Sequence, residues 1–82
     1  MNYIYAIKDE LSGFASPFVM DSDDLAKRDF MLVVRDPACN IGKSPDDYSL
    51  YRIGVYHADT GTISPESSPV KIVGARACLE VQ

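Results

Sequence analysis

The feature that most constrains the fold is the stretch YSLYRIGVYH, residues 48–57, with the turn sequence ADTG that follows it. Tyrosine, isoleucine and valine recur through the stretch, and such side chains suit the pleated, half-buried surface of a β-strand. The turn sequence suits a type I turn in which Gly61 takes the left-handed conformation as a bulge. We therefore predict a strand over residues 48–57 and a β-hairpin that turns at Ala58 to Gly61.

The tripeptide Asp-Thr-Gly, residues 59–61, is also the motif that contains the catalytic aspartate of retroviral-type aspartic proteases. Those enzymes need two aspartates that share a proton. They also have a second motif, two apolar residues and a glycine, that packs behind the catalytic loop. Residues 72–74, Ile-Val-Gly, match this second motif. Only ten residues separate Gly61 from Ile72, however, which leaves no chain to build the protease barrel and flap. We therefore interpret Asp59 as a turn residue and not as a catalytic acid.

Three further segments have the character of strands. Residues 2–9, NYIYAIKD, are rich in aromatic and β-branched side chains. Residues 14–20 could return beside them as an edge or irregular strand, because Pro17 cannot donate to a strand ladder. Residues 61–64 begin a partner for the 48–57 strand, the run PESSP interrupts it, and residues 70–75 supply a last strand.

One helix is predicted within residues 21–37, DSDDLAKRDFMLVVRDP. Ser22 or Asp21 can cap its start, and two aspartates follow in the first turn, where the helix dipole favours negative charge. Arg35 lies in the last turn, and the proline after it blocks continuation. A strand over residues 30–34 is the alternative because FMLVV is partly β-branched, but the caps favour the helix.

Together these elements predict a single α+β domain over residues 1–82, an antiparallel sheet of two hairpins with one packed helix, and a loosely ordered tail at about 76–82. So small a domain has a thin core, and a partner subunit is one remedy, so we expect a homodimer. The chain has two cysteines, Cys39 and Cys78, which is too few for a disulfide framework. No segment resembles a signal peptide or approaches the roughly 20 apolar residues of a membrane span, which favours a cytosolic protein with reduced thiols.

No constellation of residues indicates an enzyme. His57 is the single histidine, it has no nucleophile at a recognisable spacing, and with Cys39 and Cys78 it lacks the close ligand pair of a zinc site. Residues 42–44, Gly-Lys-Ser, match the end of a phosphate-binding loop, but that motif needs glycine at position 37, where this chain has proline. We expect no catalytic residue, no metal and no cofactor.

All five tyrosines lie in predicted strands, beside basic residues. Aromatic rings interleaved with basic side chains are typical of sheets on which single-stranded nucleic acid stacks. The residues predicted to contact DNA are Lys43, Tyr51, Arg52 and Lys71. Two alternatives stay open, since tyrosine rings also pack inward with their hydroxyls at the rim or form dimer interfaces. The net charge of −4 argues against broad nonspecific DNA binding.

Several short motifs occur in a specific order: YAIKD, F-x-SPF, A-x-RDF and PDDYSLYRIGVYHADTGTI. Their order and spacing, from Tyr3 to about Ala75, resemble the small non-structural protein of gokushoviruses, single-stranded DNA phages of the microvirus family. The segment FMLVVRDP departs from that family, where it is more polar. The resemblance implies a DNA-binding protein that is absent from the virion and acts in the cytoplasm of the infected bacterium. No catalytic residue comes with it.

The resemblance leads us to expect a non-enzymatic accessory factor in single-stranded DNA genome replication and packaging, which binds single-stranded DNA. The alternative is a protein-interaction module that modulates the phage replication initiator or the host replication machinery without direct DNA contact. The acidic turn at Asp21 to Asp24 would be the contact of such a module, although helix capping explains the same residues.

Overall fold

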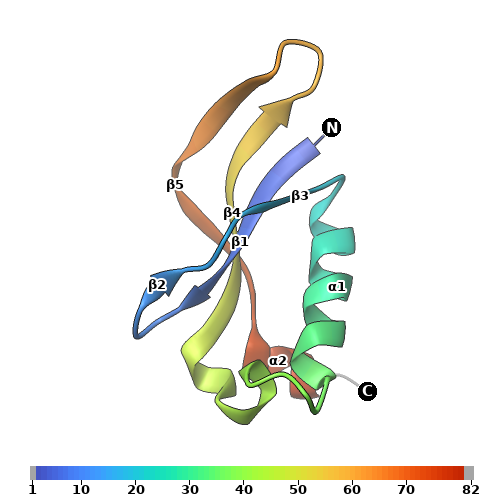
Figure 1. Cartoon of the computed structure of the whole chain (residues 1–82), viewed down its shortest axis with the longest axis vertical. Coiled ribbons are helices and arrows are strands. Elements are labelled where there is room, and N and C mark those ends of the chain that lie inside the picture. The colour runs from blue at the N-terminus through green and yellow to red at the C-terminus, as the bar shows by residue number, and fades with distance from the viewer. Residues whose placement is uncertain (1, 81–82) are drawn as a thin grey trace.

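The computed structural model of the chain describes residues 2–80. They form a small α+β domain with a curled antiparallel sheet and one main helix, as the sequence predicts (Figure 1). The elements follow one another as β1 (Asn2–Asp9), β2 (Gly13–Phe14), β3 (Phe18–Met20), α1 (Asp23–Arg35), the 3-10 turns η1 (Ile41–Lys43) and η2 (Pro45–Asp47), β4 (Tyr48–His57), β5 (Thr62–Gly74) and α2 (Ala75–Glu80).

The sheet has the order β2-β1-β4-β5, and β3 also pairs with β1. The segment predicted as one irregular strand over residues 14–20 is in fact two short strands on either side of Pro17. β2 pairs with the end of β1, at Lys8 and Asp9, and β3 pairs with its beginning. Strand β1 therefore lies inside the sheet, between this broken edge and β4.

The predicted hairpin is confirmed. Strand β4 has the expected bounds, and the backbone N–H of Gly61 donates to the carbonyl of His57 at 2.7 Å. Gly61 has a φ of +74°, the left-handed conformation that glycine adopts without strain. Strand β5 differs from the prediction, because it runs through PESSP without a break. It is an edge strand, where Pro65 and Pro69 need not donate, and two register shifts against β4 absorb the irregularity.

Helix α1 is also confirmed against the strand alternative. The Ser22 hydroxyl accepts a hydrogen bond from the backbone N–H of Leu25 at 3.2 Å, and the helix ends at Arg35, before Pro37. Ala26, Phe30 and Val34 are buried at a spacing of four, which places them on one helical face. The N-terminal cap, the stop before Pro37 and this apolar stripe favour a helix, and they outweigh the strand preference of the β-branched residues at its end.

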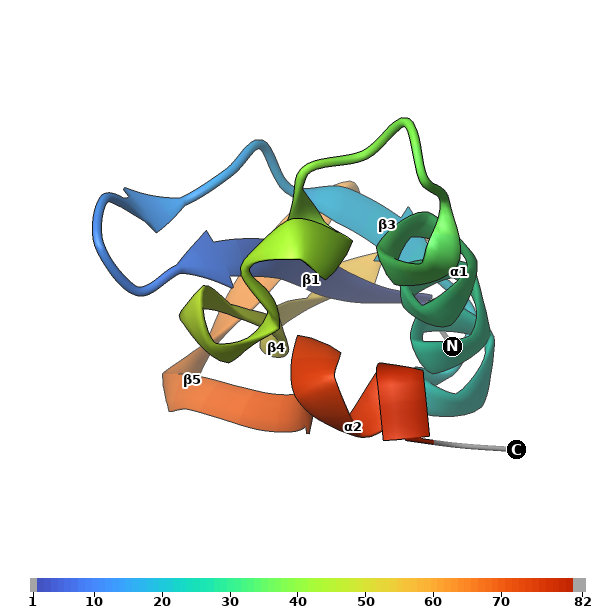
Figure 2. The ribbon, with the colours of Figure 1, turned by 90° about the horizontal axis from the view of Figure 1, so that it is seen from below.

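Helix α2 was not predicted from the sequence, which assigned no element to the segment 76–82. The described part of that segment, residues 76–80, continues the helix that begins at Ala75. Cys78 is fully buried, and its carbonyl accepts a hydrogen bond from Arg35 Nε at 3.0 Å. Figure 2 shows α2 lying beside α1, so α2 completes the core. Residues 81–82 lie outside the described part. No helix among residues 2–80 has the length and apolar character needed to cross a membrane.

The core lies between the two helices and one face of the sheet, which we call the helix face. Tyr5 and Leu50 are its largest sheet residues, and both are fully buried. Cross-strand partners share a face, so Arg52, the partner of Tyr5, also lies on the helix face. Ala6 pairs with Tyr51, and these two lie on the opposite face, which we call the open face.

Candidate nucleic-acid interface

The structure does not bring the four predicted DNA contacts together on one surface. Tyr51 and Lys71 are partners across β4 and β5, so both belong to the open face. Arg52, one residue further along β4, lies on the helix face. Lys43 is exposed at the end of η1, in the connection between α1 and β4. Only Tyr51 and Lys71 therefore form part of a common site.

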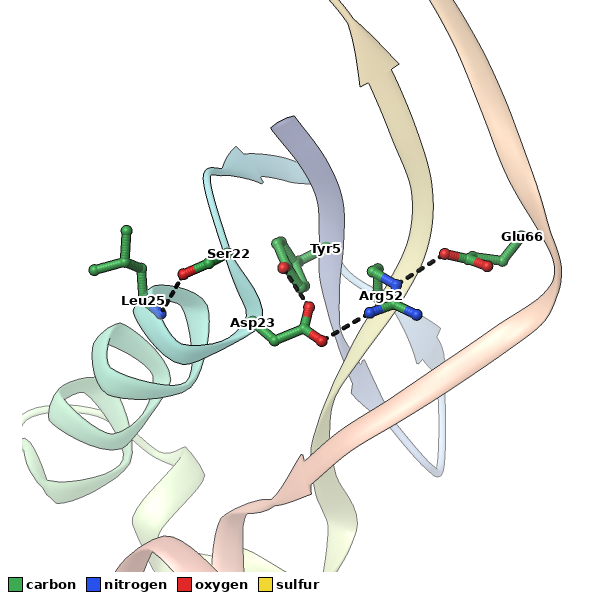
Figure 3. Close-up of polar contacts among 6 residues, drawn as sticks. All are labelled: Tyr5, Ser22, Asp23, Leu25, Arg52 and Glu66. Atoms are coloured by element: carbon green, nitrogen blue, oxygen red, sulfur yellow. Dashed lines mark hydrogen bonds and ion pairs between the residues drawn. The ribbon is translucent and has the colours of Figure 1, made fainter. Parts of the chain in front are cut away.

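Arg52 is held by two carboxylates on the helix face (Figure 3). Its Nη1 lies 2.7 Å from Asp23 Oδ2, and its Nε lies 2.8 Å from Glu66 Oε2. The guanidinium also lies 5.5 Å from the centre of the Tyr3 ring, within reach of a cation–π interaction. A DNA phosphate would have to displace these partners, so the structure gives Arg52 a role in joining α1, β4 and β5.

Asp23 is the centre of this network. Tyr5 donates its hydroxyl to Asp23 Oδ1 at 2.5 Å while Arg52 binds the other oxygen. Partial burial raises the pKa of Asp23, but the hydrogen bonds from Tyr5 and Arg52 outweigh it, and the pKa lies below its usual value. Burial, and then the bond to Asp23, raise the pKa of Tyr5. The carboxylate is thus charged and the phenol neutral at physiological pH.

A cluster of aromatic and basic side chains lies on the open face around Tyr51. The rings of Phe14 and Tyr51 meet edge to face, with their centres 5.5 Å apart. Lys8 Nζ lies 5.5 Å from the centre of Phe14 and 5.8 Å from that of Tyr51. We call Lys8, Phe14, Tyr51 and Lys71 the Tyr51 cluster. Glu10 borders it, at 3.4 Å from Lys8 Nζ and 3.5 Å from the Tyr51 hydroxyl.

Sequence reasoning missed Lys8 and Phe14 as members of this cluster. They are cross-strand partners in the β1–β2 pair, which places both on the face that carries Tyr51. The signal that could have found them is the turn at Gly13, which fixes the register of the first hairpin. Lys71 has no carboxylate at ion-pair distance among residues 2–80.

Most of the acidic residues lie away from the Tyr51 cluster, although Glu10 borders it. Five of the twelve lie on α1 or next to its ends: Asp21, Asp23, Asp24, Asp29 and Asp36. Two more, Asp46 and Asp47, lie in η2. The net charge of −4 therefore describes the helix side of the molecule better than the open face.

The remaining candidates have surface positions. His57 Nε2 lies 3.0 Å from the Ser64 hydroxyl across the β4–β5 hairpin. Asp59 is exposed in the turn of that hairpin. Within the described range 2–80, no three histidine, cysteine, aspartate or glutamate side chains gather as metal ligands.

Comparison with known proteins supplies the family. The sequence model of the family described as phage ORF5 protein matches residues 2–78. No curated protein and no solved structure matches the chain. The matched range extends from the first residue of β1 to the buried Cys78 of α2, so it includes the sheet, α1 and the Tyr51 cluster. The chain belongs to the phage ORF5 protein family.

Proposed function

We propose that this phage protein is a non-enzymatic, non-structural accessory factor in single-stranded DNA genome replication and packaging, acting in the host bacterial cytoplasm. It binds single-stranded DNA through the Tyr51 cluster. The observation that carries the proposal is the pair of rings, Phe14 and Tyr51, with the Lys8 ammonium near both of them on the open face. Bases stack on such rings, and the lysines neutralise the phosphates that link them.

Binding of this kind does not depend on base sequence, because every base presents a stacking face. Binding does require that Lys8 leave its ion pair with Glu10 and pair with a phosphate instead. An exposed ion pair contributes only about 0–1 kcal/mol, so the exchange costs little. Lys71 needs no such exchange, because no carboxylate of residues 2–80 lies at ion-pair distance from it.

The test is fluorescence anisotropy of a labelled oligothymidylate, titrated with the protein at low and at moderate salt. We expect saturable binding that weakens with salt. Replacement of both Lys8 and Lys71 by alanine removes two phosphate contacts, and each contact contributes about 0.7 to the slope of log K against log salt. Tyr51→Leu keeps the site apolar but removes a stacking ring worth about 1–3 kcal/mol.

Arg28→Ala is the matched control, because Arg28 is an exposed cation on α1, away from the cluster. It should leave both the affinity and the salt slope unchanged. Absence of saturable binding at low salt would overturn the DNA-binding proposal. An equal effect of Arg28→Ala and of the double lysine replacement would remove the Tyr51 cluster from the interface.

A second candidate function, the protein-interaction module, is favoured by a separate observation. An uncharged hollow, which we call the apolar patch, is lined by Ile4, Pro17, Phe18, Val19, Tyr56 and Ile63. Ile63 is 63% exposed and Val19 is 47% exposed. A second copy of the chain is the occupant we favour, because an uncharged patch can face its own copy without repulsion. In the protein-interaction module, the occupant of the patch is instead the phage replication initiator or a host replication protein.

The acidic turn is a weaker contact for such a partner. Ser22 caps α1, and Asp23 is engaged by Tyr5 and Arg52. Only Asp21 and Asp24 are exposed there.

A further inference from the structure

A hollow of about 290 Å³ lies between the first hairpin and η1. Asp9 and Tyr48, which line it, are cross-strand partners on the helix face, so the hollow opens on the face opposite the Tyr51 cluster. Ile7, Phe14, Ile41 and Tyr48 supply its apolar and aromatic lining, and Asp9 and Ser12 contribute polar groups. Phe14 lies at the border of the two sites, in the edge strand β2, and its ring meets Tyr51 on the open face. Pockets for ligands of drug size range from about 300 to 1,000 Å³. The hollow is therefore suited to a single planar group, such as one nucleic-acid base.

The Asp9 carboxylate retains hydrogen-bonding capacity in this hollow. Its Oδ1 accepts the backbone N–H of Leu11 at 2.9 Å. The charge of Asp9 raises the pKa of Tyr48, and partial burial and a hydrogen bond to the same carboxylate raise it further. An ionised carboxylate offers about four acceptor positions. With one used by Leu11 and one by Tyr48, two are left for a ligand.

Guanine fits two free acceptor positions better than the other bases do. Its Watson–Crick edge presents two adjacent donors, the N1–H and the 2-amino group. Adenine and cytosine present one amino group on that edge, and thymine places carbonyl oxygens on both sides of its single N–H, where they would repel a carboxylate. We propose that the hollow binds a guanine base, with Asp9 accepting both donors and the side chains of Ile7, Ile41 and Tyr48 contacting the ring.

This inference deepens the proposed function and rests on it for the source of the base, a single strand that crosses the edge strand β2 from the Tyr51 cluster on the open face to the hollow on the helix face. Ile41, which lines the hollow, begins the η1 turn that Lys43 ends. Lys43 is thereby close enough in the chain to meet a phosphate next to the bound guanosine. The pocket thus gives the strand a base preference that stacking alone lacks.

The pocket is tested without DNA by titrating the ¹⁵N-labelled protein with guanosine 5′-monophosphate and following its amide resonances. We expect shifts at Ser12, Gly13 and Ile41, smaller shifts with inosine 5′-monophosphate, which lacks the 2-amino group, and none with thymidine 5′-monophosphate. Asp9→Asn should abolish the guanosine response, because an amide nitrogen replaces one acceptor. Its remaining oxygen can still accept the Leu11 N–H, so the turn is kept.

Asp59→Asn is the matched control, since Asp59 is an aspartate in the turn of the other hairpin. It should leave the guanosine response intact. Equal responses to guanosine and thymidine monophosphates, or none to guanosine monophosphate, would overturn the pocket whatever the protein does with DNA.

A second experiment identifies the source of the guanine. An oligothymidylate with one central guanosine should bind about tenfold more tightly than the all-thymidine strand, the order expected for one bidentate contact. If both strands bind equally, the guanine pocket is wrong and the stacking proposal stands. If neither strand binds but guanosine monophosphate shifts the pocket amides, the pocket serves a free nucleotide and the DNA proposal fails.

Discussion

Arg52 of β4 and Asp23 of α1 form an ion pair, with 2.7 Å between Nη1 and Oδ2, that joins the sheet to the first turn of the main helix. Glu66 of β5 binds the same guanidinium at 2.8 Å. One cation thus connects three elements that are far apart in the sequence. The arginine that the sequence analysis assigned to DNA is engaged in the fold.

Replacement of Arg52 by alanine should destabilise the protein by about 1–3 kcal/mol. Removal of one partner leaves Asp23 and Glu66 partly buried without their counter-charge, and such orphaned groups cost this much. The free energy of unfolding in urea measures the loss. Arg76→Ala is the control, because Arg76 pairs with Asp46 at 3.0 Å where both side chains are exposed. It should change stability little, and a loss equal to that of Arg52→Ala would contradict the structural role of Arg52.

Tyr5→Phe should change how stability depends on pH above 10. The pKa of Tyr5 in the folded protein is raised above the value of about 10 in the unfolded chain. The stability that the phenol contributes is therefore fully present below pH 10 and is lost as the pH rises toward the folded pKa, because the unfolded chain releases its proton first. Urea unfolding across neutral to alkaline pH measures this loss.

At neutral pH the Tyr5→Phe variant should be less stable by about 1 kcal/mol, since it lacks the hydrogen bond to Asp23. Above pH 10 that difference should narrow, because only the parent loses the contribution of Tyr5. Tyr48 also has a raised pKa, but it is present in both proteins and cancels in the comparison. A difference that stays constant up to pH 11 would show that Tyr5 titrates normally.

The sequence was sufficient for elements whose signals are local. Ser22 and Pro37 delimit α1, and Gly61 with the residues before it specifies the β4–β5 turn. The face of the sheet on which a side chain lies, and its cross-strand partner, were harder to predict, because both depend on the register between strands that are distant in the sequence. One bulge in the β1–β4 pair, between Ile4 and Tyr5, decides how the residues beyond it are aligned.

The candidate site shows the same limit. Arg52 and Tyr51 are neighbours in the chain and lie on opposite faces, so their shared strand says nothing about a shared surface. Lys8 comes near Tyr51 through the pairing of β1 with β4, and Phe14 comes near both through the pairing of β2 with β1. Helix α2 was missed because six residues are too few to show a helical period.

Gly42→Ala should destabilise the protein by about 1–3 kcal/mol, the usual cost of overpacking. A Cβ at Gly42 would clash with the backbone carbonyl oxygen of Val34 in the last turn of α1. The 3-10 turn η1 would have to move away from the helix, and Ile41 would lose its contact with the core. This glycine of the Gly-Lys-Ser run thus permits close packing.

Thermal and urea unfolding measure the effect of Gly42→Ala. Gly74→Ala is the matched control, because a Cβ there would lie 3.7 Å from its nearest neighbour, the Ser49 hydroxyl oxygen, an ordinary contact. It should change stability by less than about 1 kcal/mol. Equal effects of the two substitutions would mean that η1 is not packed against α1.

Sedimentation velocity should show a dimer that Ile63→Lys converts to monomer. Ile63 is 63% exposed in the apolar patch, and a lysine there would place two like charges at the contact between copies. Leu32→Lys is the control, since Leu32 is 65% exposed on α1, outside the patch. A strict monomer at high concentration would contradict the homodimer. Loss of binding to the phage replication initiator in Ile63→Lys, with Leu32→Lys unaffected, would then assign the patch to that partner.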